Sequence, residues 1–187
     1  MISVAEIRYS VAGALRLARA DADGLAHFDH TIERYWRSFW AAAICAPMYV
    51  AIMVFLQQST PPKDWTRFVA ILVVDYAIAW SLWALAMVYL ADWMQRGHLY
   101  FRYFQVYNWA QVVGTTLGFV VLLLAQGMNT ASLVALLWFV TLAVLVYEWY
   151  LTRLALEVSG LQAAGVVAFN LVLNYTINYA SAAVTRL

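Results

Sequence analysis

Five stretches of this 187-residue chain are long and apolar enough to cross a lipid bilayer as helices. A helix that spans the hydrocarbon core of a bilayer needs about 20 mostly apolar residues. The predicted bounds of the five spans are Tyr35–Gln57, Trp65–Met94, Tyr100–Ala125, Ser132–Tyr150 (whose helix runs on past Arg153) and Leu161–Ala183. Hydrophobic residues make up 65% of the chain and charged residues 11%, against about 45–50% and 25% in soluble domains. The sequence therefore predicts an all-α, polytopic membrane helical bundle with five transmembrane helices.

The first residues of the chain differ in character from the rest, which divides it into an N-terminal part, residues 1–34, and a five-helix transmembrane domain, residues 35–187. Residues 2–20 predict a helix that is amphipathic but too polar to span a membrane. The side chains expected to contact a membrane surface are Val4, Ile7, Val11, Leu15, Arg16 and Arg19. Two placements are open: the helix lies flat on the cytoplasmic leaflet as an interfacial helix, or it packs across the mouth of the bundle.

Short polar stretches separate the predicted helices. Asp29 or Thr31 is expected to cap the first span, because short polar side chains accept hydrogen bonds from the free N–H groups of a helix start. The later connectors are predicted at Ser59–Asp64, Gln95–His98, Gln126–Thr130 and Ser159–Gly160. Pro47, near the middle of the first span, lacks a backbone N–H and predicts a kink there.

The basic residues favour one orientation across the membrane. With the N-terminus in the cytoplasm, the inner side holds Arg8, Arg16, Arg19, Arg34, Arg37, Arg96, Arg102 and Arg153, and the outer side holds Lys63, Arg67 and Arg186. Eight of the 11 Lys and Arg residues are then inside and three outside, as the positive-inside rule requires. The sequence therefore predicts a cytoplasmic N-terminus and a C-terminus outside.

Five polar residues fall at similar depths near the predicted bilayer midplane: Asp75, Asn108, Gln111, Asn170 and Asn174. An ionised carboxylate at the bilayer centre costs about 2.5–3.5 kcal/mol on insertion scales, and no basic residue lies at the depth of Asp75. We therefore expect Asp75 to stay protonated or to accept hydrogen bonds from Asn108, Gln111 or Asn170. One interpretation is a proton or cation site; the other is a buried neutral acid that fixes helix register.

Two patterns predict close helix packing. Gly114 and Gly118 match the small-xxx-small spacing that lets helices approach closely in lipid, within one chain or between chains. Asn178 continues the spacing of four residues set by Asn170 and Asn174, so the three asparagines form a ladder on one helix face. Glu148, near the inner end of the fourth span, is expected to pair with Arg102 or Arg153 or to remain solvated.

The sequence gives little support to an enzyme. The histidines His27, His30 and His98 all lie in connectors, which does not favour a haem held between transmembrane helices. His27 and His30 are three residues apart, but they match no zinc motif, and we predict no metal or other cofactor. The only cysteine, Cys45, is expected to be a small core residue. The net charge of +1 gives no overall field that would favour nucleic acid as a partner.

Five spans, a cytoplasmic N-terminus and a very short exterior tail resemble the Yip family, whose eukaryotic members interact with Rab GTPases and which has relatives in bacteria. The resemblance covers the whole span pattern and rests on architecture. The runs Tyr35–Phe39 and Tyr107–Gln111 are also similar to small bacterial inner-membrane proteins. This likeness implies a bacterial inner membrane as the location and implies no activity.

Two functional hypotheses follow. In the first, the protein is a non-enzymatic accessory or scaffold subunit, or a membrane-organising protein. It would act through residues 4–18, Gly114 and Gly118, or the asparagine ladder, with the lipid bilayer and other membrane subunits or further copies of itself as partners. In the second, it is a small proton- or cation-coupled carrier with Asp75 at its centre.

Overall fold

The computed structural model describes residues 2–57, 61–124 and 128–186, with only the backbone at residue 130 and residues 182–186. Its helices are α1 (Val4–Ala18), η1 (Ala22–His27), α2 (Ile32–Ser38), α3 (Trp40–Leu56), α4 (Trp65–Trp93), η2 (Gly97–Leu99), α5 (Tyr100–Leu124), α6 (Thr130–Ala155) and α7 (Gly160–Arg186). Five helical stretches are long and apolar enough to cross a membrane: Ile32–Leu56, Trp65–Trp93, Gly97–Leu124, Ala131–Ala155 and Gly160–Ser181. The predicted all-helical fold with five spans is confirmed, and the chain is a membrane protein. Parts of the predicted connectors Ser59–Asp64 and Gln126–Thr130 lie outside the described residues.

The first span is two helices rather than one. The α2 and α3 helices meet at Phe39, which ends the first and begins the second. Just before it, the hydroxyl of Ser38 donates to the carbonyl oxygen of Tyr35 at 2.6 Å, a local bond that competes with regular helix geometry. Pro47, where the sequence predicted a kink, lies inside the continuous helix α3.

Three helices end in the same way. Ala20, Gln95 and Glu157 follow α1, α4 and α6 with φ of 60°, 60° and 53°. The next residue then donates its N–H back to the helix, to the carbonyl oxygens of Arg16, Ala91 and Arg153 at 3.0, 2.7 and 3.2 Å respectively. This is the Schellman arrangement, in which the left-handed position is usually glycine. Here residues other than glycine occupy it at the ends of all three helices.

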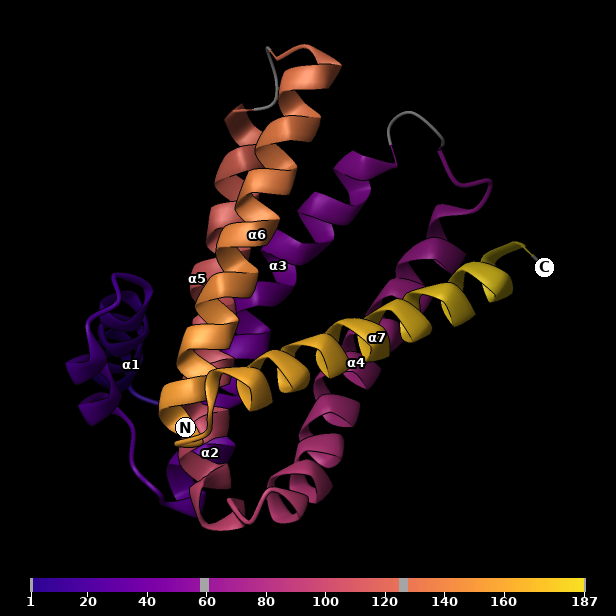
Figure 1. Ribbon diagram of the computed structural model, residues 1–187. Helices are drawn as coiled ribbons and strands as arrows, with labels where there is room; N and C mark the ends of the chain where they lie inside the picture. Colours follow the sequence, from indigo (N-terminus) through magenta and orange to yellow (C-terminus); the bar gives the residue numbers. More distant parts are fainter. Residues whose placement is uncertain (1, 58–60, 125–127, 187) are drawn as a thin grey trace.

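The long helices form two groups that diverge (Figure 1). In the upright group, α5 packs between α3 and α6. In the leaning pair, α4 and α7 run antiparallel, with the rings of Trp83 and Phe169 6.2 Å apart. The turns Met94–Leu99 and Leu156–Ser159 connect the two groups at one end of the molecule, which we name the joint end. Toward the opposite, open end the leaning pair moves away from α5 and α6, and α3 is inclined between them (Figure 1).

The N-terminal helix α1 packs on the bundle near the joint end. It lies against η1, α5 and α6, and its buried residues are Ser10, Gly13, Ala14 and Leu17. Two tyrosine hydroxyls of α6 hold its backbone: Tyr147 donates to the carbonyl oxygen of Ala14 at 2.8 Å, and Tyr150 to that of Ala20 at 2.9 Å. The structure places α1 against α5 and α6, and whether it also lies on the cytoplasmic leaflet stays a prediction.

The predicted membrane-surface residues are only partly on the buried side of α1. Ile7 and Val11 are half-buried against the core, whereas Val4 and Leu15 stay 67% and 40% exposed. Arg16 binds Asp21 at 2.6 Å within the N-terminal unit, and this hydrogen bond lowers the pKa of Asp21. The exposed side chains leave contact with a membrane surface as a prediction.

The connector to α2 is tied to the bundle as well. The Thr31 side chain caps α2 by accepting from the Arg34 N–H at 3.4 Å, as predicted. Asp29 accepts from Thr31 and Arg34, and although burial opposes its ionisation, these hydrogen bonds lower its pKa. The Gln105 side chain donates to the Asp29 carbonyl oxygen at 2.8 Å. The joint end is therefore held by several independent polar contacts.

Candidate functional site: a cavity between the two helix groups

A cavity of about 470 Å³ lies between the upright group and the leaning pair. All five long helices α3 to α7 contribute to its wall. The lining residues are Cys45, Tyr49 and Met53 of α3; Asp75, Tyr76, Ala79, Trp80 and Trp83 of α4; Phe104, Tyr107, Asn108, Gln111 and Thr115 of α5; Val140, Thr141, Val144, Leu145 and Glu148 of α6; and Asn170, Leu171, Asn174, Ile177 and Asn178 of α7.

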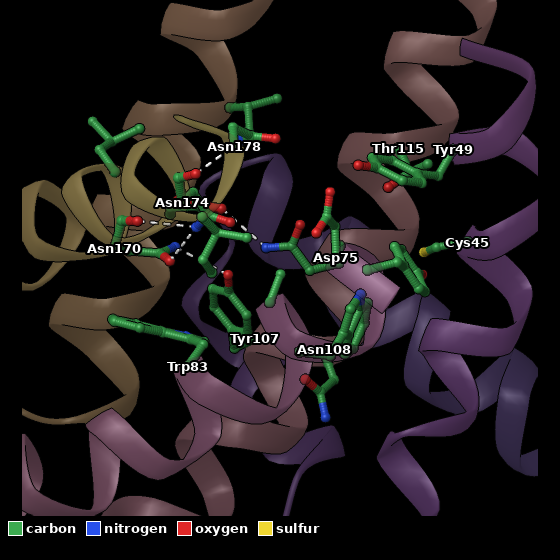
Figure 2. Close-up of a pocket in the computed structure, with 18 of the residues that line it drawn as sticks. Cys45, Tyr49, Asp75, Trp83, Tyr107, Asn108, Thr115, Asn170, Asn174 and Asn178 are labelled. Atoms are coloured by element: carbon green, nitrogen blue, oxygen red, sulfur yellow. Dashed lines mark hydrogen bonds between the residues drawn. The ribbon is translucent and has the colours of Figure 1, made fainter. Parts of the chain in front are cut away.

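The structure brings the predicted intramembrane polar residues together around this cavity. Asp75, Asn108, Gln111, Asn170 and Asn174 all line it. They come from three helices, and on each helix the polar positions share a face because they are three or four residues apart. Figure 2 shows Asp75 between the asparagines of α7 on one side and the α3–α5 side of the cavity on the other.

The predicted hydrogen-bond partners of Asp75 were wrong. The carboxyl group of Asp75 accepts a short hydrogen bond from the hydroxyl of Ser181 near the end of α7. None of the three amides named from the sequence donates to it in the described structure: Asn108 donates to Ser38 at 2.8 Å, Gln111 to Glu148 and Asn170 to Tyr107. The reason is that α4 packs against α7 along its length, which places a serine of α7 opposite Asp75.

A second carboxyl group, Glu148, lines the same cavity, where the sequence predicted an ion pair or a solvated charge. Its Oε1 accepts from Gln111 Nε2 at 3.0 Å. The expected partners are engaged elsewhere, because Arg102 binds Glu157 at 2.9 Å and Arg153 lies over the Trp149 ring. Five residues along a helix correspond to a rotation of about 140°, so Glu148 and Arg153 point in different directions.

The sequence did contain a pattern that places Glu148 on the cavity side of its helix. Glu148 lies four residues after Val144 and seven after Thr141, so the three share one helix face, and all three line the cavity. Depth in the membrane alone, which placed Glu148 apart from the other polar residues, did not carry this information.

The asparagine ladder of α7 bonds mainly along its own helix. Asn174 Nδ2 donates to the Oδ1 and backbone oxygen of Asn170 at 2.7 and 2.9 Å, and Asn178 Nδ2 donates to the backbone oxygen of Asn174 at 2.8 Å. Asn170 reaches across to α5, donating to the Tyr107 hydroxyl at 3.0 Å (Figure 2). The ladder therefore presents amide groups to the cavity, including Asn178, which was predicted as a packing residue.

Two buried polar atoms of the cavity wall have no hydrogen-bond partner among the described residues: Asn108 Oδ1 and Trp83 Nε1. Asn108 is 0% and Trp83 3% exposed. Figure 2 shows the Asn108 amide turned away from the asparagine ladder, where its Nδ2 meets Ser38. Buried polar atoms without partners cost stability, and neither atom exposes appreciable surface to the cavity.

Aromatic rings form much of the remaining wall. The Tyr49 and Tyr76 rings are 5.0 Å apart, and Tyr76 and Trp80 are 5.9 Å apart. On the joint side, the rings of Trp83 and Tyr107 are 5.8 Å apart. The Tyr76 hydroxyl donates to the Ala42 carbonyl oxygen at 2.7 Å, which ties the leaning pair to α3.

The two glycines predicted to pack helices face helices of this chain. A side-chain carbon added at Gly114 would lie 3.7 Å from Val144 of α6, and one added at Gly118 would lie 3.7 Å from Ile52 of α3. A carbon at either position would make ordinary van der Waals contact, so the packing within the chain does not require glycine there. Both glycines are half-buried.

The charges of the cavity are of one sign. Asp75 and Glu148 are its ionisable acids, and no lysine, arginine or histidine is among the lining residues that the structure describes. Such a wall can bind a cation or carry protons on its carboxyl groups. His27, one of the two histidines considered as metal ligands, lies outside the cavity, with its ring 4.4 Å from that of Tyr9.

Comparison with known protein families, with curated proteins and with solved structures found no match for the chain. The resemblance to the Yip family therefore stays a prediction, and functional inference depends on the cavity itself.

Proposed function

We propose that the protein is a small membrane carrier that binds a cation in the cavity between its two helix groups. The observation that supports this function is the pair of carboxyl groups, Asp75 and Glu148, in a cavity with no basic residue among its described lining residues. Charges inside a membrane protein normally have a partner, because an uncompensated charge there is costly. A bound cation or a pair of protons supplies that compensation.

Each group in the cavity has a role in this proposal. The carboxyl groups attract the cation. Among the described residues, one side chain donates a hydrogen bond to each of them: Ser181 to Asp75 and Gln111 to Glu148. A carboxylate has about four acceptor sites, so both retain capacity for a ligand.

The arrangement of the helices suggests how the site changes its access. Rocking of one helix group against another around a fixed site is a common transport movement. In this protein the leaning pair would move against the upright group, with the turns Met94–Leu99 and Leu156–Ser159 as pivots. The joint end carries most of the basic residues, so we place it on the cytoplasmic side of a bacterial inner membrane, with the open end and the C-terminus outside.

The proposal is tested by charge movement in proteoliposomes on a solid-supported membrane. We expect at least one of Na⁺, methylammonium and 4-phenylbutylammonium to give a protein-dependent current. Asp75→Asn and Glu148→Gln should each reduce that current at least about tenfold, because a hydrogen bond to a charged group contributes about 1.5–3 kcal/mol. Asp23→Asn, a matched change at a side chain that is 86% exposed, should leave it unchanged.

Two results would contradict the carrier. One is the absence of current above that of empty liposomes for all three cations. The other is wild-type current in both cavity variants, provided that each variant elutes from gel filtration like the wild type.

The accessory or scaffold role is the second candidate, and it has less support. Exposed aromatic side chains near the joint end favour it, notably Trp36, Tyr89 and Trp93, which are 64%, 70% and 80% exposed. These side chains also suit the membrane–water interface. The native mass of the protein, extracted in mild detergent, separates the candidates: a defined set of other subunits would support the accessory role.

A further inference from the structure

The cavity is lined by both polar and apolar side chains. The polar side chains of its wall include Asp75, Glu148, Gln111 and the asparagine ladder. The apolar side chains come from several helices and include Met53, Val144 and Ile177. A site of this kind suits an amphiphilic ligand, with a charged end and an apolar body, better than a bare ion.

The size of the cavity also favours an organic ligand over a metal ion. Its volume of about 470 Å³ lies within the range of about 300–1,000 Å³ that is usual for pockets that hold organic molecules. A desolvated metal ion is held by oxygen ligands at about 2.0–2.6 Å and would leave most of this space unfilled.

The rings of the wall are a third observation, and they concern charge. Tyr49, Tyr76 and Trp80 form a continuous aromatic row beside Asp75, with neighbouring centroids 5.0 and 5.9 Å apart. Aromatic faces attract organic cations, most strongly where water is excluded. An ammonium group near Asp75 would therefore meet a carboxylate and ring faces at once.

The carboxyl groups of the wall add hydrogen-bonding detail. Ser181 donates to Asp75 and Gln111 donates to Glu148. A carboxylate has about four acceptor sites, so each retains sites for the N–H groups of a protonated amine.

From these four observations we infer that the ligand of the cavity is an organic ammonium ion with an apolar, ring-sized body. The ammonium group binds among Asp75, Glu148 and the amides, and the body lies against the aromatic and aliphatic wall. This inference rests on the proposed function, because it names the class of cation that the carrier would bind.

The experiment measures binding to the purified full-length protein in lipid nanodiscs by isothermal titration, with empty nanodiscs as the control for partition into lipid. The three probes separate charge from apolar body. They are 4-phenylbutylammonium, which has both; methylammonium, which has the charge alone; and 4-phenylbutan-1-ol, which has the body alone.

We expect 4-phenylbutylammonium to bind at least about tenfold more tightly than either other probe, since burying an apolar body and pairing a charge are each worth more than 1.4 kcal/mol. Asp75→Asn and Glu148→Gln should each weaken its binding at least about tenfold and leave the alcohol unaffected. Asp23→Asn and Glu33→Gln, at exposed carboxylates of the N-terminal part, should change nothing.

Each other outcome overturns the inference in a recognisable way. If methylammonium binds as tightly as 4-phenylbutylammonium and the carboxyl variants weaken both, the apolar body is irrelevant and only the proposed cation carrier survives. If the alcohol binds as tightly as the amine, the cavity selects for apolar bulk. If no probe binds to the wild type, both the inference and the proposed function fail. The comparison of the three probes on the wild type tests the inferred class of ligand even if a variant does not fold.

Discussion

The two halves of α5 differ in how far their side chains are buried. In the first half most side chains are buried: Tyr100, Tyr103, Phe104, Gln105, Val106, Asn108, Trp109, Ala110 and Val112. From Val113 to Leu124 only Val121 is buried. Both halves belong to one continuous helix of the same membrane span, so helix formation does not distinguish them. What distinguishes them is that α3 and α6 flank both halves, whereas the first half also meets α2 and the connector before it, through Tyr35–Tyr100 and Asp29–Gln105.

The comparison teaches that the cavity borders the well-packed half of the helix. The joint end is held by buried rings, ion pairs and tyrosine–backbone hydrogen bonds. Phe104, Tyr107, Asn108 and Gln111 of the first half line the cavity, and Thr115 is the lining residue from the second half. The acidic groups therefore lie between a closely packed end and the open end, and ligand entry requires some opening.

The largest expected effect contrasts two truncations on α5 itself. Trp109→Ala removes a ring that is 2% exposed in the first half and should lower the free energy of unfolding by about 3–5 kcal/mol. Leu123→Ala changes a side chain that is 53% exposed in the second half and should cost less than about 0.5 kcal/mol. Unfolding in mixed detergent micelles, followed by circular dichroism, measures both. Equal losses would mean that the two ends do not differ in stability.

The next contrast uses two glycines. A carbon added at Gly24 would lie 2.6 Å from the carbonyl oxygen of Gly13, so the N-terminal unit would have to shift. Gly24→Ala should therefore destabilise the protein by about 1–3 kcal/mol. The matched change Gly165→Ala, at a position of α7 with no atom within 4 Å, should be neutral or stabilise by up to about 1 kcal/mol. The same unfolding assay applies, and a harmless Gly24→Ala would show that α1 and η1 are loosely packed.

A smaller effect in the opposite direction is expected at the helix ends. Gln95 has a φ of 60°, a conformation that costs an ordinary residue about 1–2 kcal/mol and glycine much less. Gln95→Gly should stabilise the joint by up to about 1 kcal/mol. Gln57→Gly, at a helix end where φ is −87°, is the control and should not stabilise. A lower melting temperature for Gln95→Gly would contradict the prediction.

The smallest effect concerns the ion pair at the joint. The hydrogen bond from Arg102 lowers the pKa of Glu157, so the pair stabilises the folded protein above the unfolded pKa of about 4.3 and loses this contribution as the pH falls through the folded pKa. Because Glu157 is 57% exposed, the contribution is about 0.2–1 kcal/mol. Glu157→Gln should therefore be less stable than the wild type at pH 6 and equal to it near pH 3 (about one unit below the reference pKa). Parallel pH curves for the two proteins would exclude the pair as a source of joint stability.

The sequence predicted the positions of the helices well and the hydrogen-bond partners of individual side chains poorly. The second span was predicted as Trp65–Met94 and forms a helix over Trp65–Trp93, because apolar length and flanking polar turns determine where a membrane helix begins and ends. The break at Phe39 was missed because it depends on a hydrogen bond of the Ser38 hydroxyl, which is not visible in a hydropathy pattern.

The same distinction applies to the cavity. Asp75, Gln111 and Asn170 could be grouped from depth and helical spacing alone. The bonds they make could not, because the choice between Ser181 and an amide for Asp75 depends on which helices are neighbours. Glu148 was expected to pair with an arginine or to remain solvated, whereas its helix face directs it toward Gln111. Orientation across the membrane, the location and the resemblance to the Yip family stay predictions.

The contacts that hold α1 have a consequence for the order of events during synthesis. Tyr147, which binds the Ala14 carbonyl oxygen, is 133 residues further along the chain. At about 5–20 residues per second, the ribosome makes α1 on the order of ten seconds before the α6 part of its docking surface exists. During that interval only η1 and then α5 can cover the apolar side of α1, and the other apolar surface nearby is the membrane into which the first spans are being inserted. The newly made helix would then rest on the leaflet first and transfer to α6 once the fourth span is in place.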